Sequence, residues 1–277
     1  MSKTARLTAY IDGIGLIGPG LDNWPAAQPI LAGSAAYESH PLLVAAPQSL
    51  PPAERRRTGL AVKVALTVAF DAIAAGQLDA KQLAAVFTSS GADNDNCDAI
   101  CKTLASDDRS ISPTRFHNSV HNAPAGYWGI ASGAMTPATV LCAHDASFGA
   151  GLLEAMTQVV VDSQVDFERR GTLLIAYDMP YPEPLHAKRP LPGAFGIALA
   201  LMPVRSAQSL ARIELELSDA APDTLADLAL EALRRSIPAA RGLPLLQAVA
   251  RGGAGRVALD YLAPLSLAIT VKPVGRT

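Results

Sequence analysis

Short apolar stretches that suit β-strands alternate along this sequence with longer apolar stretches that suit α-helices, and this alternation limits the fold more than any single motif. Residues 7–17 (LTAYIDGIGLI) and 83–88 (LAAVFT) have the length and composition of buried strands. Between them, residues 55–77 place apolar side chains at helical spacing, and Gly76 follows the last of these. The alternation predicts an α/β protein with a mixed, mostly parallel sheet that helices cover on both faces.

Further strands and helices continue the same alternation. The expected helices are 98–104, which Asn94 or Asp95 caps, 148–161, and 223–236, which Asp223 or Thr224 caps. The expected strands are 138–143, 173–177, 196–202 and 212–217, with one or two more within 257–271. The strands at 196–202 and 212–217 are expected to pair as a hairpin. No repeat or long polar linker interrupts the chain, so we expect a single domain over residues 1–277.

Composition and charge exclude several functions. The formal net charge of −2 argues against a protein that binds nucleic acid by neutralising phosphates. The longest apolar run, residues 194–204, is too short to span a membrane, and no signal peptide precedes the first strand. The 3 cysteines are too few for a disulfide scaffold. We therefore expect a reduced, cytoplasmic protein without a membrane or nucleic-acid partner.

Several short motifs follow one another in a definite order. They are residues 11–19 (IDGIGLIGP), 31–33 (LAG), 89–91 (SSG), 112–116 (SPTRF), 122–126 (NAPAG) and 189–196 (RPLPGAFG). In this order they resemble the N-terminal half of the β-ketoacyl synthases, which have the thiolase-like fold. The resemblance covers roughly residues 7–217. It implies a ketosynthase-like region at 1–217 and a shortened remnant of a truncated C-terminal half at 218–277.

The resemblance also implies a nucleophile position that this chain does not fill with cysteine. Ketosynthases place a cysteine at a strand-to-helix turn, where the helix dipole lowers the pKa of the thiol and backbone N–H groups form an oxyanion hole. Aligning Pro137 without gaps puts Asp145 at that position, and Cys142 precedes it in the strand. A carboxylate cannot hold a transferable acyl thioester. The position is therefore expected to be degenerate, with Asp145 as the cap of the next helix. Mimicry of an acylated or carboxylated state, or a hydrogen bond to the partner subunit, stays open as an alternative.

Condensation in this family also needs two histidines from the C-terminal half, which stabilise the enolate and the thioester oxyanion. The 5 histidines of this sequence all precede residue 187, and they are His40, His117, His121, His144 and His186. The resemblance therefore implies that this chain alone performs no condensation and uses no cofactor.

Ketosynthase homologues without the catalytic residues include the chain-length factors, and this chain resembles the short form found in aryl-polyene and xanthomonadin-like biosynthesis. The resemblance implies a non-catalytic subunit in a type II polyketide or fatty-acid-like pathway. Such a subunit forms a heterodimer with an active β-ketoacyl synthase and helps to shape its acyl tunnel. An acyl carrier protein is a further candidate partner.

The resemblance assigns candidate residues to two surfaces. In this fold, the strand before the nucleophile turn pairs with the same strand of the partner, which satisfies its edge hydrogen bonds. The candidate interface residues are Ala138, Thr139, Val140, Leu141, Cys142, Ala143, His117, His121, Tyr127 and Trp128. The candidate tunnel residues are Cys97, Ile100, Cys101, Leu104 and Phe116. Their helical spacing is equally typical of a buried helix, so a place in the core stays open.

Other hypotheses also stay open. The chain could be a small thiolase-fold acyltransferase or hydrolase that uses Cys142, or a homodimeric small-molecule-binding protein. Two pairs at helical spacing, Cys97 with Cys101 and His117 with His121, are not spaced as zinc ligands usually are, so we expect no metal site. The basic run at residues 55–57 suits a solvated helix start or contact with an acidic carrier protein.

Overall fold

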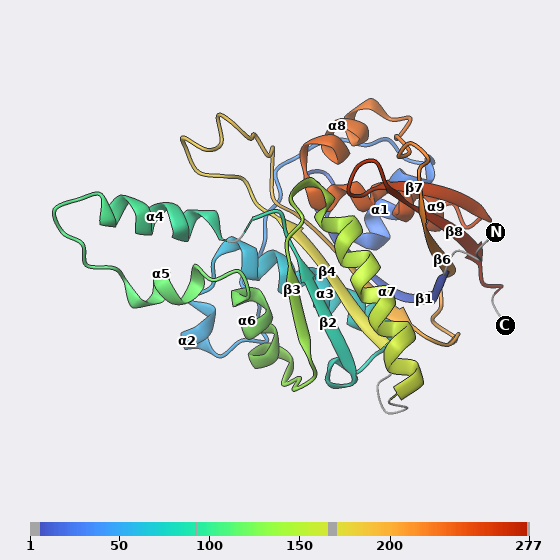
Figure 1. Ribbon diagram of the computed structural model, residues 1–277, viewed down its shortest axis with the longest axis horizontal. Coiled ribbons are helices and arrows are strands. Elements are labelled where there is room, and N and C mark those ends of the chain that lie inside the picture. Colours follow the sequence, from blue (N-terminus) through green and yellow to red (C-terminus); the bar gives the residue numbers. More distant parts are fainter. Residues whose placement is uncertain (1–5, 92, 166–170, 276–277) are drawn as a thin grey trace.

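The computed structural model describes residues 6–91, 93–165 and 171–275, and its strands form a single 8-stranded sheet (Figure 1). The strands are β1 (Leu7–Ile17), β2 (Leu83–Thr88), β3 (Ala138–Leu141), β4 (Gly171–Asp178), β5 (Phe195–Met202), β6 (Ala211–Ser218), β7 (Gly255–Asp260) and β8 (Ser266–Pro273). Their order across the sheet is β3-β2-β4-β5-β1-β6-β8-β7. The strands expected near residues 7, 83, 138 and 173 are therefore all present.

The sheet is mixed, as expected, but its antiparallel pairs outnumber its parallel ones. Within the described residues, parallel ladders join β2 to β3 and to β4. The ladders β4–β5, β5–β1, β1–β6, β6–β8 and β8–β7 are antiparallel. The expectation of a mostly parallel sheet is therefore wrong. Apolar periodicity shows that a segment is a strand and how it is buried, but not which way its neighbour runs.

The expected hairpin between residues 196–202 and 212–217 is also wrong, because β1 lies between β5 and β6. The start of β1, from Leu7 to Ile11, pairs with β6, and its later part, up to Ile17, pairs with β5. Tyr10 and Ile11 pair with both neighbours, and the register of the ladder with β5 shifts between Ile11 and Gly13, as at a β-bulge. Strands β5 and β6 follow one another along the chain, but the N-terminal strand β1 lies between them in the sheet.

The helices connect these strands in the expected places, although their bounds differ in detail. They are α1 (Trp24–Ala32), α2 (Pro52–Arg55), α3 (Leu60–Gly76), α4 (Asn94–Leu104), α5 (Pro113–Asn118), α6 (Ala123–Ser132), α7 (Ser147–Val165), α8 (Leu228–Ser236) and α9 (Leu243–Ala250). Short 3₁₀ turns lie at Ala80–Gln82 (η1), His144–Ala146 (η2) and Pro238–Gly242 (η3).

Two helices of the N-terminal half begin at positions that differ from the expected ones. The helix expected at 55–77 begins only at Leu60, as α3, because Gly59 before it is extended (φ −75°, ψ 176°), and the short α2 ends at Arg55. Helix α4 starts before residue 98, and its cap is Asp93, whose carboxylate accepts a hydrogen bond from the Asn96 N–H at 3.2 Å. Neighbouring polar side chains here are all suitable caps, and only the backbone geometry selects one.

Helix α8 likewise starts later than expected. Its cap is Asp227, whose carboxylate accepts hydrogen bonds from the N–H groups of Ala229 and Leu230, each at 2.9 Å. The expected cap, Asp223, instead accepts a hydrogen bond from the Ala258 N–H at 2.9 Å. Asp223 therefore ties the loop before α8 to strand β7.

Helices α3 and α7 lie on opposite faces of the sheet, and the sheet divides the core into two parts (Figure 1). Successive side chains of a strand point to opposite faces, so neighbours in β2 enter different parts. Val86 packs in the part that contains α7, whereas Phe87 packs in the part that contains α3. The turn between β3 and α7 consequently lies at one edge of the sheet, directly after its outermost strand.

Candidate functional site

The turn from β3 into α7 is closed by hydrogen bonds within a few residues. The Ser147 hydroxyl accepts a hydrogen bond from the Ala143 N–H at 3.1 Å and donates one to the His144 carbonyl at 2.7 Å. His144 has a φ of 50°, in the left-handed region that non-glycine residues rarely adopt. The Thr88 hydroxyl, at the end of β2, donates to the Ser147 carbonyl at 2.8 Å. The result is a tight strand-to-helix turn beside the carboxyl end of β2.

Two arginines hold the carboxylate of Asp145 within this turn. One oxygen lies 2.5 Å from Nη2 of Arg189, and the other lies 3.3 Å from Nη2 of Arg241. The expectation that Asp145 caps α7 is therefore wrong, since its carboxylate is bound by side chains and Ser147 closes the turn. Asp145 does lie at the start of this helix, in η2, as the alignment of Pro137 predicts.

The ion pairs of Asp145 belong to a longer series of ion pairs. Arg241 also binds Asp260 at 3.0 Å, and Asp260 in turn binds Arg234 of α8 at 2.5 Å. On the other side, Nη1 of Arg189 lies 2.6 Å from Nε2 of His144. Arg189, from the loop before β5, and Arg241, from the C-terminal segment, therefore neutralise Asp145. These arginines could not be identified from the sequence, because they lie far from Asp145 along the chain.

The ionised form of Asp145 is favoured in the folded protein. Partial burial by itself would raise its pKa, but the hydrogen bond from Arg189 and the charges of Arg241 and Arg189 outweigh this and lower the pKa. A carboxyl with a lowered pKa stabilises the fold above the unfolded pKa of about 3.9, and this contribution is lost as pH falls through the folded pKa.

Asp145→Asn is accordingly expected to destabilise the protein at neutral pH but not at low pH. The loss at pH 7 should be about 1 kcal/mol or less, because water screens a carboxylate that is more than a third exposed. Urea unfolding of both proteins at pH 7 and near pH 3 measures this difference. The control is Asp219→Asn at an exposed position, which should change little. A difference that is equally large at both pH values would contradict the ion-pair assignment.

A second carboxyl, Asp178 at the end of β4, is fully buried beside the same edge. It accepts hydrogen bonds from the Ser90 N–H at 2.8 Å, the Ser90 hydroxyl at 2.6 Å and the Ala239 N–H at 2.7 Å. Burial raises the pKa of Asp178 to about 6, although these hydrogen bonds favour its ionised form. Because its pKa is higher in the folded state, stability should fall as pH rises from about 3.9 to about 6.

Asp178→Asn is expected to remove that pH dependence and also to weaken the fold. The NH₂ of asparagine cannot accept a hydrogen bond as the carboxylate oxygen does, so near pH 4 the variant should be about 1–3 kcal/mol less stable than the parent. This deficit should shrink toward pH 7, where only the parent ionises a buried carboxyl. The free energy of unfolding, measured from pH 4 to pH 7, tests both parts. No deficit near pH 4 would contradict the hydrogen-bond arrangement, and a deficit that stays constant up to pH 7 would contradict the raised pKa.

Cys142 follows β3 and lies outside the helix start. Its side chain is exposed, and the thiol lies 3.3 Å from the Ser90 carbonyl oxygen as a donor. The expected strand at 138–143 ends at Leu141, so Cys142 and Ala143 belong to the turn region. The other candidate interface positions of this segment, Ala138 to Leu141, form β3 itself.

Strand β3 is the outermost strand of the sheet next to β2, and its residues are exposed or half-buried. Among the described residues, its outer edge has no strand partner. Such an edge presents unpaired N–H and C=O groups that can pair with another chain. The placement agrees with the expectation of a dimer strand, while the pairing itself stays a prediction.

The other four candidate interface residues, two aromatic residues and two histidines, differ in how deeply they are buried. Tyr127 and Trp128 are 2% and 3% exposed and pack in the core, so their place in an interface stays a prediction. Their helix, α6, is turned so that Trp128 packs on Phe70 of α3 with 5.0 Å between the ring centroids. His117 is exposed and His121 is half-buried, and burial lowers the pKa of His121.

The candidate tunnel residues lie on an arm that consists of α4, α5 and the connection between them, and it projects from the body of the molecule (Figure 1). No residue of α4 is buried, so the alternative that these positions belong to the core is wrong. Leu104 is 48% and Phe116 is 64% exposed, and Cys97, Ile100 and Cys101 are half-buried or exposed. In the part of the chain that the structure describes, no cavity is lined by the α4 residues among them, and their contact with the tunnel of a second chain stays a prediction.

A cavity of about 370 Å³ lies where the arm meets α6. It is lined by Phe116, His117, Val120, Asn122, Ala123, Gly126, Tyr127 and Ile130. Val120 and Ile130 are also exposed large apolar side chains, at 47% and 51%. The base of the arm therefore presents an apolar surface.

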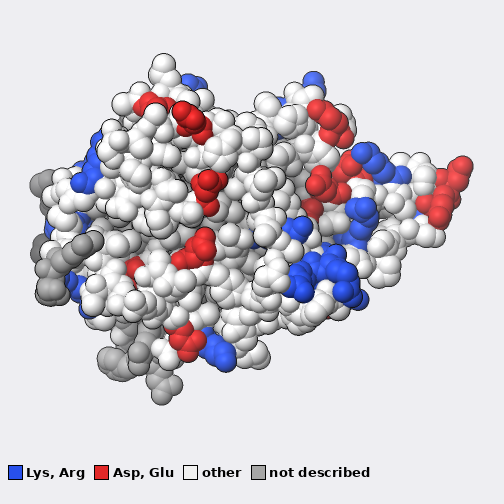
Figure 2. Space-filling model, turned by 180° about the vertical axis from the view of Figure 1, so that it is seen from behind, with Lys and Arg blue, Asp and Glu red and all other residues white. Residues whose placement is uncertain are grey.

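Basic side chains gather at the base of the arm, around α2 (Figure 2). Arg55 donates a hydrogen bond to the side chain of Gln48, and Arg57 pairs with Glu54 at 3.2 Å. Arg56 and Arg57 are exposed. The run is therefore a solvated helix end, and its contact with an acidic carrier protein stays a prediction.

Neither a metal site nor a membrane span is found in the part of the chain that the structure describes. No group of His, Cys, Asp and Glu side chains there could hold a metal ion. In residues 6–91, 93–165 and 171–275, no helix is long and apolar enough to cross a membrane.

Known structures share this architecture across most of the chain. A chain from a ketosynthase in complex with its chain length factor, from Xenorhabdus doucetiae, is 22% identical, with a TM-score of 0.70 over 95% of this chain and 99% of that chain. A chain from a type II polyketide acyl-carrier protein in complex with its ketosynthase bound to the hexaketide is 10% identical, with a TM-score of 0.71 over 98% and 100%.

A longer ketosynthase matches only in part. The ketosynthase from module 1 of the bacillaene synthase from Bacillus amyloliquefaciens FZB42 is 13% identical, with a TM-score of 0.55. The match covers 79% of this chain but 47% of that one. At these identities the likenesses show the fold, which is the thiolase-like ketosynthase fold expected from the motifs.

Sequence comparison identifies the family. Among curated proteins, none matches this chain. The family model described as "Beta-ketoacyl synthase, N-terminal domain" matches residues 23–253, which include α7 and the turn that carries Asp145. This protein therefore belongs to the β-ketoacyl synthase N-terminal domain family.

Proposed function

We propose that this chain is a chain-length-factor subunit, which forms a heterodimer with an active β-ketoacyl synthase and helps to shape its acyl tunnel in type II polyketide or aryl-polyene biosynthesis. The observation that carries the proposal is the state of the nucleophile turn. Asp145 occupies the turn, and Arg189 and Arg241 hold its carboxylate. A carboxylate in two ion pairs cannot form the transferable thioester on which condensation depends, which supports a condensing cysteine supplied by another subunit.

The surfaces of the chain support a partner of this kind. Edge strand β3 and the apolar base of the arm lie in one region, joined by α6. A partner ketosynthase that pairs with β3 would reach the candidate tunnel residues of the arm, such as Phe116. A similar solved structure contains a ketosynthase in complex with its chain length factor. The candidate carrier protein would meet the basic side chains around α2.

Residues 1–217 and 218–277 function as one domain in this proposal. Strand β8 pairs with β6 from Ala211 to Ser218, so the C-terminal segment extends the same sheet. The ion pairs of Arg241 join it to the nucleophile turn. The three cysteines are free, which suits a reducing compartment, and we place the complex in the cytoplasm.

Co-expression with an active β-ketoacyl synthase from the same source tests the proposal. The two chains are expected to purify as a heterodimer that extends acyl chains from a carrier protein. Replacing the cysteine nucleophile of the ketosynthase with alanine should abolish condensation, whereas Asp145→Ala in this chain should leave the chemical step in place. A chain that takes up acyl groups by itself, or that does not associate with the ketosynthase, would overturn the proposal.

A second candidate function uses Cys142 as the nucleophile of a small acyltransferase or hydrolase. The observation that favours it is the exposed thiol near the turn. If this candidate is correct, Cys142→Ala should abolish acyl uptake from a carrier protein, and iodoacetamide should label Cys142 rapidly near pH 7. Under the chain-length-factor proposal, neither result is expected.

A further inference from the structure

A second apolar cavity lies between the loop of residues 186–192 and helix α8, and the chain-length-factor role does not use it. Its volume is about 650 Å³, within the range of about 300–1,000 Å³ that is typical of small-molecule sites. It is lined by Pro19, Tyr37, Ser39, His186, Pro190, Pro192, Ala229, Ala232, Leu233 and Ser236. Three segments that are distant in sequence therefore form its walls.

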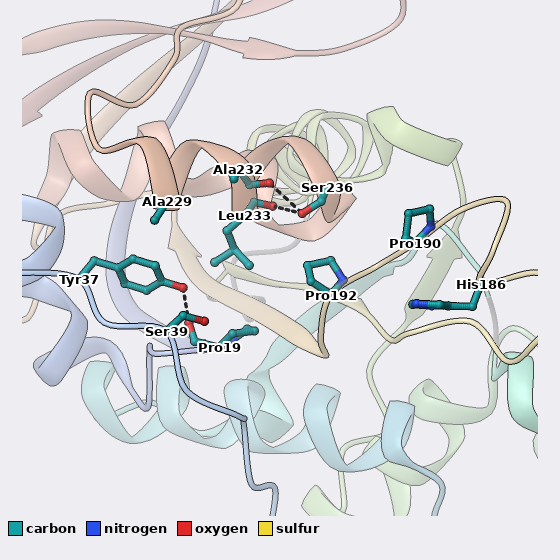
Figure 3. Close-up of a pocket in the computed structure, with 10 residues that line it drawn as sticks. All are labelled: Pro19, Tyr37, Ser39, His186, Pro190, Pro192, Ala229, Ala232, Leu233 and Ser236. Atoms are coloured by element: carbon teal, nitrogen blue, oxygen red, sulfur yellow. Dashed lines mark hydrogen bonds between the residues drawn. The ribbon is translucent and has the colours of Figure 1, made fainter.

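The arrangement of these side chains shows what the cavity can hold (Figure 3). Leu233 points from α8 into the space between the Tyr37 ring and Pro192, while Pro190 and His186 form the opposite end. Proline rings, an aromatic ring and a leucine offer flat apolar surfaces. A planar apolar molecule can stack against surfaces of this kind.

The polar groups of the wall are few, and most already have partners. The Tyr37 hydroxyl donates to the Pro19 carbonyl at 2.8 Å, and the Ser236 hydroxyl donates to the Ala232 carbonyl at 2.8 Å. Burial raises the pKa of Tyr37, so its phenol stays neutral. Among the described residues, the His186 ring has no hydrogen-bond partner, which leaves it available to a ligand.

No lining residue is Asp, Glu, Lys or Arg. An anion would find no cation in this wall, and a cation would find no carboxylate. Burying an unpaired charge costs free energy, so the cavity selects against both. From the neutral wall, the flat apolar surfaces and the volume, we propose that this cavity binds an uncharged aromatic or conjugated small molecule.

The position of the cavity gives such a ligand a structural effect. One wall is the loop that carries Arg189, and the other is α8, which carries Arg234. These two arginines lie at opposite ends of the ion-pair chain through Asp145, Arg241 and Asp260. A ligand that fills the space between the loop and α8 therefore contacts the two elements that carry these arginines, and so stabilises both ends of the series of ion pairs.

Two dyes that differ only in charge test the proposal on the full chain. N-phenyl-1-naphthylamine is neutral, and 1-anilinonaphthalene-8-sulfonate adds one sulfonate to the same ring system. The neutral dye is expected to bind saturably, with one site per chain and about tenfold greater affinity than the anion, which corresponds to about 1.4 kcal/mol. Fluorescence titration measures both affinities.

A matched pair of variants on α8 locates the dye. Ala232→Phe places a ring into the cavity from an exposed lining position and should weaken binding of the neutral dye by about tenfold or more. Leu228→Phe adds a ring on the same helix at a position that is 84% exposed and does not line the cavity, so it should leave affinity unchanged.

Three results would overturn the proposal. They are the absence of saturable binding of the neutral dye, equal affinity for the anionic dye, and an Ala232→Phe variant that binds like the parent. A cavity that serves a segment of a partner ketosynthase instead would show no saturable binding of the neutral dye to the free chain, while Ala232→Phe would weaken the heterodimer. The dye titrations need neither condensation activity nor a ketosynthase, so their outcome is independent of the chain-length-factor proposal.

Discussion

Replacing Gly15 with alanine is expected to destabilise this protein more than any other single-methyl change considered. Helix α3 crosses β1 so closely that a Cβ at Gly15 would lie 1.9 Å from the carbonyl oxygen of Val68. The obstacle is the backbone of a buried helix, which cannot rotate away as a side chain could. Overpacking of a core typically costs about 1–3 kcal/mol, and we expect a loss at or above the top of this range.

The free energy of unfolding in urea measures this loss, and Gly126→Ala is its matched control. Gly126 lies inside helix α6, and a Cβ there meets nothing within 4 Å. Alanine should therefore leave the fold intact and stabilise it by roughly 0.5–1 kcal/mol, because glycine is a poor helix former. If Gly15→Ala were as stable as Gly126→Ala, the close packing of α3 on β1 would be wrong.

The second large effect is expected at the edge strand. In the ladder between β2 and β3, the Ala85 N–H donates to the Pro137 carbonyl at 3.0 Å, and Ala85 is in register with Ala138. Because alternate residues of a strand direct their N–H groups to the same side, Val140 points its N–H away from β2. Val140→Pro should therefore remove a hydrogen-bond donor from the free edge while it preserves the internal ladder.

If β3 pairs with a ketosynthase strand, Val140→Pro should weaken the heterodimer by about tenfold or more, since it removes one hydrogen bond and places a proline ring in the contact. Val140→Ala is the control, because it shortens the side chain but retains the N–H. The dissociation constant can be measured by analytical ultracentrifugation, and the thermal midpoint of the free chain reports whether the variant folds. A folded Val140→Pro variant that binds the ketosynthase like the parent would exclude β3 as the dimer strand.

Prediction from sequence was most accurate where structure depends on near neighbours. The bounds of β2 were predicted to the residue, and β1 was also placed correctly, because the length of an apolar run depends on local composition. The same local reasoning did not select the caps of α4 and α8, where several suitable polar residues lie together. It also overestimated the parallel share of the sheet, because the partner of β5 comes from the first residues of the chain.

At the candidate site, too, features set by local sequence were predicted correctly and features set by distant contacts were not. The order of the motifs placed Asp145 at the turn before α7, and the family match agrees with that order. The role of Asp145 as a helix cap was wrong, because its partners Arg189 and Arg241 are brought to it only by folding. The spacing of Cys97, Ile100, Cys101 and Leu104 was compatible with a core helix, yet the arm projects from the body (Figure 1).

By itself the sequence determined the family, the succession of strands and helices, and the presence of a carboxylate where a thiol is expected. These properties follow from residue identity and short-range spacing. The tertiary structure alone decided which strands are neighbours, that β3 forms a free edge, that the arm is exposed, and that two arginines neutralise Asp145. Each of these depends on contacts between residues that are distant along the chain. The local periodicity of the sequence does not predict such contacts.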